Sequence, residues 1–99
     1  MGAVEFTTKQ SGETVKEAFR AAVEHAQYMN GHGGYTGTIA EKGSFTLIPR
    51  SEMEDGEDEY EFARRLINER DNRIDDKWGP AGAVKINENK WLFFGKASY

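Results

Sequence analysis

Apolar and polar residues alternate in several short runs of the chain, a pattern that predicts β-strands. These runs lie at residues 3–9, 35–40, 44–48, 83–86 and 90–95. The connection at 41–43 is short and contains a glycine, so it is expected to close a hairpin, and the last two runs are expected to form another. The final run has large apolar side chains on both faces, which is typical of a central strand or of one whose second face a partner covers.

Two other segments repeat their apolar residues every three or four positions, which predicts amphipathic helices. The first helix is expected to begin after Thr14, because Thr14 and Glu17 match a capping box, and to end at the Asn30-Gly31 pair. The second is expected from about residue 58 to about residue 72. Arg70 falls on the apolar stripe of this second helix, where its side chain either extends outward to solvent or points into a functional pocket.

The predicted element order is therefore β-α-β-β-α-β-β, in a single α+β domain over residues 1–99. A two-layer sandwich satisfies this order, with an antiparallel sheet and two helices on one face. Its first six elements have the order of a ferredoxin-like fold. A sheet covered on one side leaves its other face to water or to a partner, so a homodimer through that face is one arrangement that the fold allows.

Composition narrows the class of protein further. The 99 residues carry a net charge of −4 and include no cysteine, which excludes disulfides, thiolate metal sites and a cysteine nucleophile. Apolar runs are all far shorter than the ~20 residues of a membrane span, and the chain does not begin with a basic segment followed by an apolar one. We expect a protein of the cytoplasm that has no membrane partner and no cofactor.

Acidic residues are concentrated in one segment, and residues 51–61 contain seven acids and no base. The simplest interpretation is a solvated connector at 50–58, followed by acids that favour the positive end of the second helix. An EF-hand calcium loop fails on spacing, because aligning Gly56 with the conserved glycine puts Ser51 and Met53 where acidic ligands belong. The alternative is electrostatic docking on a basic partner surface. The residues expected to dock are Glu54, Asp55, Glu57, Asp58 and Glu59.

Four of the nine residues in the loop at 30–38 are glycine. Such loops can surround an anion with backbone N–H groups, although this one follows a helix C-terminus, where the dipole has the wrong sign for an anion. The alternatives are a helix cap followed by a turn and a site for a small anionic ligand such as a nucleotide. The ligand site would use His32, Gly33, Gly34, Tyr35, Thr36 and, from the second helix, Arg70.

Catalytic and nucleic-acid signatures are weak. His25 and His32 are the only histidines and have no obvious further zinc ligands, and no nucleophile motif is present, so we expect no enzyme activity and no metal. His32 stays a conceivable acid or base. Net negative charge disfavours nucleic acid, and a solvated, salt-bridged helix face explains the basic residues at 64–77 more simply. Trp91 and Phe93 could stack on bases only if their face of the sheet is open.

Two stretches are similar to small uncharacterised proteins of tailed bacteriophages. GHGGYTGTIAEKGSF at 31–45 resembles their G-H-x-x-Y-x-G-T-I loop, and DKWGPAGAV at 76–84 resembles their K-W-G-P-A turn. The resemblance covers about a quarter of the chain and carries over no catalytic residue. It implies action in the cytoplasm of a bacterial host cell. We therefore expect a non-enzymatic binding or inhibitor module that acts on a host or defence protein, with the small-ligand protein as the alternative.

Overall fold

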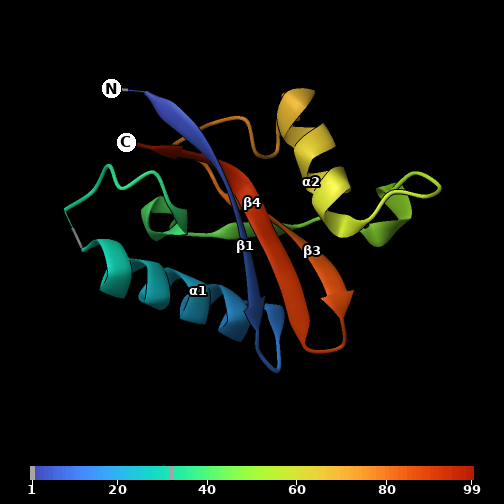
Figure 1. Ribbon diagram of the computed structural model, residues 1–99, viewed down its shortest axis with the longest axis horizontal. Helices are drawn as coiled ribbons and strands as arrows, with labels where there is room; N and C mark the ends of the chain where they lie inside the picture. Colours follow the sequence, from blue (N-terminus) through green and yellow to red (C-terminus); the bar gives the residue numbers. More distant parts are fainter. Residues whose placement is uncertain (1, 32) are drawn as a thin grey trace.

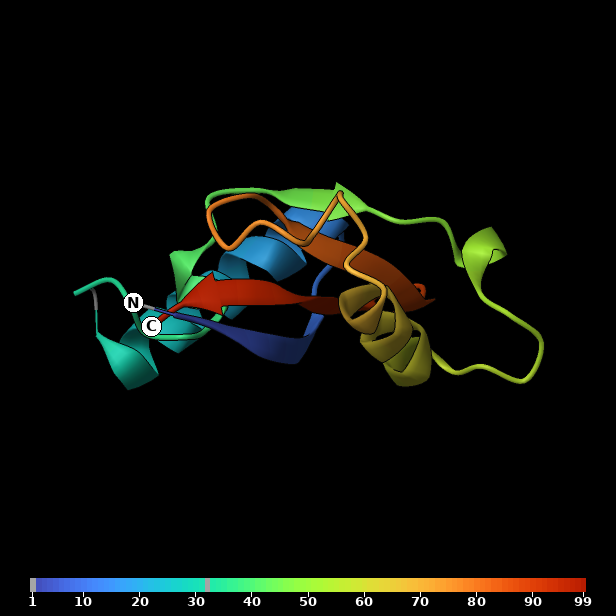
Figure 2. The ribbon, with the colours of Figure 1, turned by 90° about the horizontal axis from the view of Figure 1, so that it is seen from above.

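Four strands form one mixed sheet in the order β1-β4-β3-β2 (Figure 1). The computed structural model describes residues 2–31 and 33–99. The strands are β1 (Ala3–Ser11), β2 (Phe45–Leu47), β3 (Ala81–Asn87) and β4 (Lys90–Ser98). β4 is antiparallel to both of its neighbours, whereas β2 runs parallel to β3. Viewed from above, β1 and β2 are the two edges of the sheet, with β4 and β3 between them (Figure 2).

Both helices begin where local chemistry favours a start. Helix α1 (Val15–Asn30) follows Thr14, whose hydroxyl accepts a hydrogen bond from the N–H of Glu17 at 3.1 Å. Gly31, at φ 83°, ends this helix, so both predicted ends of α1 are confirmed. Helix α2 (Glu59–Asn68) has a full capping box between Asp58 and Glu61. Its start agrees with the prediction, but it ends four residues early, because Arg70 adopts a left-handed φ of 56°.

The two helices pack on opposite faces of the sheet, so the expected placement of both on one face is wrong. In Figure 1, α1 lies to the lower left of β4 and α2 to its upper right. Helix α1 packs through its buried alanines against Trp91 and Phe93, whereas α2 packs against Leu92 and Phe94. Neighbouring residues of a strand point to opposite faces, so β4 separates two hydrophobic clusters.

Strand direction explains this arrangement. β1, β2 and β3 all run the same way, because β4 is antiparallel to β1 and to β3. The chain crosses the whole sheet through α1 to reach β2 and then turns back through α2 to reach β3. Crossover connections between parallel strands are almost always right-handed. The step from β2 to β3 crosses the sheet in the opposite direction to the step from β1 to β2. A right-handed connection therefore places α2 on the face opposite α1.

The α+β class is confirmed, but the predicted element order and the purely antiparallel sheet are wrong. Residues 35–40 form no strand: Tyr35 and Gly37 have φ angles of 58° and 72°, and a 3₁₀ turn covers Ile39–Glu41. A second 3₁₀ turn covers Arg50–Glu52. Without the first hairpin, β2 joins the sheet parallel to β3, and the ferredoxin-like order is not confirmed.

The central position predicted for the last strand is confirmed. Phe93 and Phe94 are both fully buried, and Phe93 makes an edge contact with Phe19 of α1, with 5.6 Å between ring centroids. Gly82 of β3 gives the Phe94 ring room, since a Cβ there would lie 2.8 Å from it. The face that carries Trp91 and Phe93 is therefore closed by α1, which removes it as a platform for bases or as a dimer surface. Within the described residues, no helix has the length and apolar character needed to cross a membrane.

Candidate functional site

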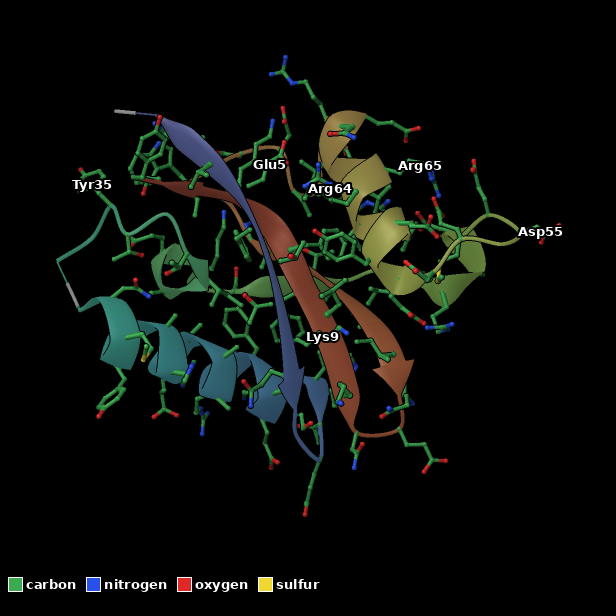
Figure 3. The ribbon with its side chains drawn as sticks, viewed as in Figure 1. Glu5, Lys9, Tyr35, Asp55, Arg64 and Arg65 are labelled. Atoms are coloured by element: carbon green, nitrogen blue, oxygen red, sulfur yellow. The ribbon has the colours of Figure 1, made fainter. Side chains whose placement is uncertain are left out.

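The clearest exposed feature is an aromatic patch, formed by Tyr35, Trp78 and Tyr99. Their exposed fractions are 50%, 62% and 58%. The rings of Tyr35 and Trp78 meet edge to face, with 6.2 Å between centroids, and the Lys77 ammonium lies 5.1 Å from the Trp78 centroid. Figure 3 shows Tyr35 on the side of the molecule where both chain termini lie. The loops at 31–45 and 76–84, which carry the phage-like motifs, therefore meet at this patch.

Tyr99 joins the patch through the first residues of the chain. Its ring lies so close to Gly2 that a Cβ there would come 2.7 Å from it, and the Gly2 carbonyl accepts a hydrogen bond from the Lys77 ammonium at 3.4 Å. Gly37 also has to be small, because a Cβ there would lie 2.8 Å from Val4. The N–H of Gly37 donates to the Ser98 carbonyl at 2.7 Å, which fixes the Tyr35 loop to the end of β4.

Lys42 holds the loop that presents Trp78. The side chain of Lys42 is buried, with 4% of its surface exposed. Its ammonium donates to the backbone carbonyls of Asp76, Lys77 and Gly79 at 3.3, 3.1 and 3.0 Å. Burial lowers the pKa of Lys42, and the negative charge of Asp76 partly opposes that effect. One buried cation thus fixes the backbone on both sides of Trp78.

The acidic residues of 51–61 are mostly paired within the chain. Arg65 of α2 binds Glu57 through two hydrogen bonds of 2.8 and 3.0 Å, and Arg73 binds Glu52 through two of 2.9 and 2.8 Å. Glu59 pairs with Arg50. The hydrogen bonds from these arginines hold the pKa values of all three glutamates below their ordinary range. The segment is therefore fastened to α2 and to the residues that follow it.

The five acids expected to dock on a partner differ in how free they are. Asp58 caps α2, and Glu57 and Glu59 pair with arginines. Glu54 is exposed and lies 3.9 Å from Arg65, and Figure 3 shows Asp55 at the outer tip of the loop, away from Arg65. Two of the five thus keep much of their charge available to a partner.

Basic side chains around α2 also have partners inside the chain. Arg64 lies 3.5 Å from Glu5, Arg70 lies 3.2 Å from Asp75, and Arg73 additionally contacts Asp71. The salt-bridged helix face expected for this region is thus present. Within it, Arg65 pairs with Glu57 and Glu69, whereas Glu61 belongs to the capping box of α2.

The described residues of the alternative ligand site in the glycine-rich loop are exposed or have partners within the chain. His32 lies outside the described residues. Gly33 and Gly34 are exposed, Tyr35 joins the aromatic patch, and Thr36 donates through its N–H and its hydroxyl to the Glu41 carboxylate, at 3.1 and 2.8 Å. Burial raises the pKa of Glu41, but these hydrogen bonds outweigh that effect and lower it, so the carboxylate stays ionised. Arg70 pairs with Asp75 instead of approaching the loop.

An open groove lies between α1 and the chain that leads into β2. Its volume is about 420 Å³, within the range of small-ligand sites. Its apolar lining comes from Phe19, Val23 and Phe45. Its charged lining from α1 is two bases, Lys16 and Arg20, and one acid, Glu24. The part of the chain that the structure describes contains no group of three or more potential metal ligands.

Comparisons with protein-family models, with curated proteins and with solved structures found no match to this chain.

Sequence reasoning missed Trp78 and Tyr99 of the aromatic patch and Lys42, which supports it from beneath. Lys42 is part of Glu-Lys-Gly, which is typical of a surface turn, and its carbonyl acceptors lie more than thirty residues away. Trp78 is part of the K-W-G-P-A turn, and nothing in that stretch shows that its ring meets Tyr35. The one available signal was that both phage-like motifs contain an aromatic residue flanked by glycine.

Proposed function

We propose that this protein is a non-enzymatic binding module that docks on another protein through the aromatic patch. The observation that carries the proposal is the exposure of Tyr35, Trp78 and Tyr99 on loops that are fixed from beneath. Trp and Tyr are the residues that most often dominate binding energy at protein interfaces. A surface that is held in place before binding loses less conformational entropy when the partner arrives.

The acidic residues of 51–61 have a secondary part in this proposal, because several of their charges are already paired within the chain. Exposed ion pairs contribute little to stability, but they reduce the charge that a partner meets. With Glu57 and Glu59 already paired, Asp55 and Glu54 are the acids that remain to steer association. They are expected to affect the association rate more than the final affinity.

The resemblance to phage proteins suggests a bacterial host or defence protein as the partner. The test is quantitative capture from a bacterial lysate, with the wild-type chain and two variants as baits. Trp78→Ala should lose the partner. Tyr28→Ala removes an exposed aromatic residue in the last turn of α1 that is not part of the aromatic patch, so it should retain the partner at wild-type stoichiometry. Equal capture by all three baits would overturn the proposed site.

A second candidate function, binding of a small anionic ligand, rests on the groove beside α1. An apolar lining in which Lys16 and Arg20 outnumber the one acid, Glu24, suits a planar anion such as a nucleotide. The ionised Glu41 argues against the glycine-rich loop for this role. A thermal-shift panel of nucleotides tests it. A nucleotide at ~100 times its Kd should stabilise the chain by about 2.7 kcal/mol, and Arg20→Glu should abolish the shift. No shift with any nucleotide would remove this candidate.

A further inference from the structure

The outer edge of β1 is long, and no strand within residues 2–31 and 33–99 pairs with it. β1 has nine residues and β4 on one side only, whereas the other edge strand, β2, has three residues. Figure 2 shows β1 at the rim of the sheet, between the ends of α1 and α2. A long edge strand of this kind offers a row of backbone donors and acceptors to another strand.

Hydrogen bonds at the two ends of β1 show which backbone groups point outward. The N–H of Gly12 donates to Asn89, and the Gly2 carbonyl accepts from Tyr99, so the even-numbered residues direct their backbone groups toward β4. The β1–β4 register is continuous from Ala3 to Ser11. Alternation along a strand therefore directs the backbone groups of the odd-numbered residues outward. The central one of these is Thr7.

Charges along β1 favour one partner, a second copy of β1. Glu5 and Lys9 lie two residues on either side of Thr7, on the face that α2 covers. An antiparallel copy centred on Thr7 would place each Glu5 opposite Lys9 of the other chain and would overlap all nine residues. Shifting the centre to Glu5 or to Lys9 would instead place like charges opposite each other, which is unfavourable.

We propose that two copies of this chain associate through antiparallel pairing of β1 with β1, about a two-fold axis at Thr7. The result is a continuous eight-stranded sheet with Ala3 opposite Ser11, Glu5 opposite Lys9, and Thr7 opposite Thr7. Each of these facing pairs exchanges two hydrogen bonds, because their backbone groups all point outward. The interface is isologous, as a two-fold axis requires, and leaves the aromatic patch outside the strand pairing.

Sedimentation velocity over a concentration series is the first test. The wild-type chain should pass from monomer to dimer as concentration rises, and a monomer at every soluble concentration would overturn the proposal. Thr7→Pro removes one outward N–H while sparing the bonds to β4, so it should give a folded monomer. A folded Thr7→Pro dimer would place the interface elsewhere.

Exchanging the charges of Glu5 and Lys9 tests the register of the β1–β1 pairing, and this test does not depend on the proline variant. Because Glu5 also lies near Arg64, as Figure 3 shows, the series uses Arg64→Gln as its background. Lys9→Glu should weaken the dimer about tenfold or more, since two opposite-charge pairs become two like-charge pairs. Adding Glu5→Lys should restore it. Equal dimerisation by Arg64→Gln alone, by Arg64→Gln with Lys9→Glu, and by the variant that also carries Glu5→Lys would exclude this register.

Hydrogen exchange then identifies the strand without any substitution. The amides of Glu5, Thr7 and Lys9 should become protected only at concentrations at which the dimer forms. Those of Phe6 and Thr8, already bonded to β4, should be protected in the monomer as well. An unprotected Thr7 amide in a sample that is dimeric would contradict the proposal.

Discussion

Replacing Lys42 with methionine should loosen the support of the aromatic patch. The substitution keeps the apolar stem of the side chain but removes three hydrogen bonds to the carbonyls of Asp76, Lys77 and Gly79. A hydrogen bond to a charged group contributes ~1.5–3 kcal/mol, although the ammonium no longer has to be buried and water can reach part of the loop. We expect a loss of about 2–4 kcal/mol of unfolding free energy.

Urea unfolding followed by circular dichroism measures this loss. In a thermal melt, at ~4–8 °C per kcal/mol for a domain of this size, the melting temperature should fall by roughly 8–32 °C. A Trp91→Phe background leaves Trp78 as the single tryptophan, and its fluorescence anisotropy should fall when Lys42 is replaced. Lys16→Met, which removes an exposed ammonium from α1, is the matched control and should change stability by less than about 0.5 kcal/mol. A Lys42→Met variant as stable as this control, with unchanged Trp78 anisotropy, would refute the reasoning.

Three further predictions test the packing and the charges. Gly82→Ala should destabilise the chain by ~1–3 kcal/mol in urea unfolding, because its Cβ would lie 2.8 Å from the ring of Phe94 in a closed core. Ser98→Ala should be neutral or slightly stabilising by the same assay, since the buried Ser98 hydroxyl finds no hydrogen-bond partner among the described residues. The glutamates that pair with arginines have lowered pKa values, so their contribution to stability is complete above the ordinary carboxyl pKa of ~4 and is lost as pH falls through the folded-state values. Thermal melts should therefore show a falling Tm below about pH 4, and a Tm that stays constant or rises there would contradict these pairings.

Local signals in the sequence predicted the helices well. Thr14 and Gly31 mark the two ends of α1 because capping depends on residues within one turn of each end. The central position of β4 was also predicted from a local signal, the apolar side chains on both faces of the strand. That pattern also implied a cover for each face, and so already conflicted with two helices on one side.

Long-range features could not be predicted from local patterns. Tyr35 and Trp78 meet because β2 runs parallel to β3, and nothing within residues 35–48 specifies that pairing. The acids of 51–61 look free in the sequence because Arg65 and Arg73 lie eight and twenty-one residues from Glu57 and Glu52. Their neutralisation depends on how the loop folds back on α2.

The most direct test of the central claim is the affinity of the aromatic patch for the partner captured in the lysate experiment. Isothermal titration calorimetry with the purified partner should give a Kd about 30-fold or more weaker for Trp78→Ala than for the wild-type chain, as for a binding hot spot of ≥2 kcal/mol. Tyr28→Ala should leave the Kd unchanged. A Kd for Trp78→Ala within about threefold of wild type would contradict docking through the aromatic patch.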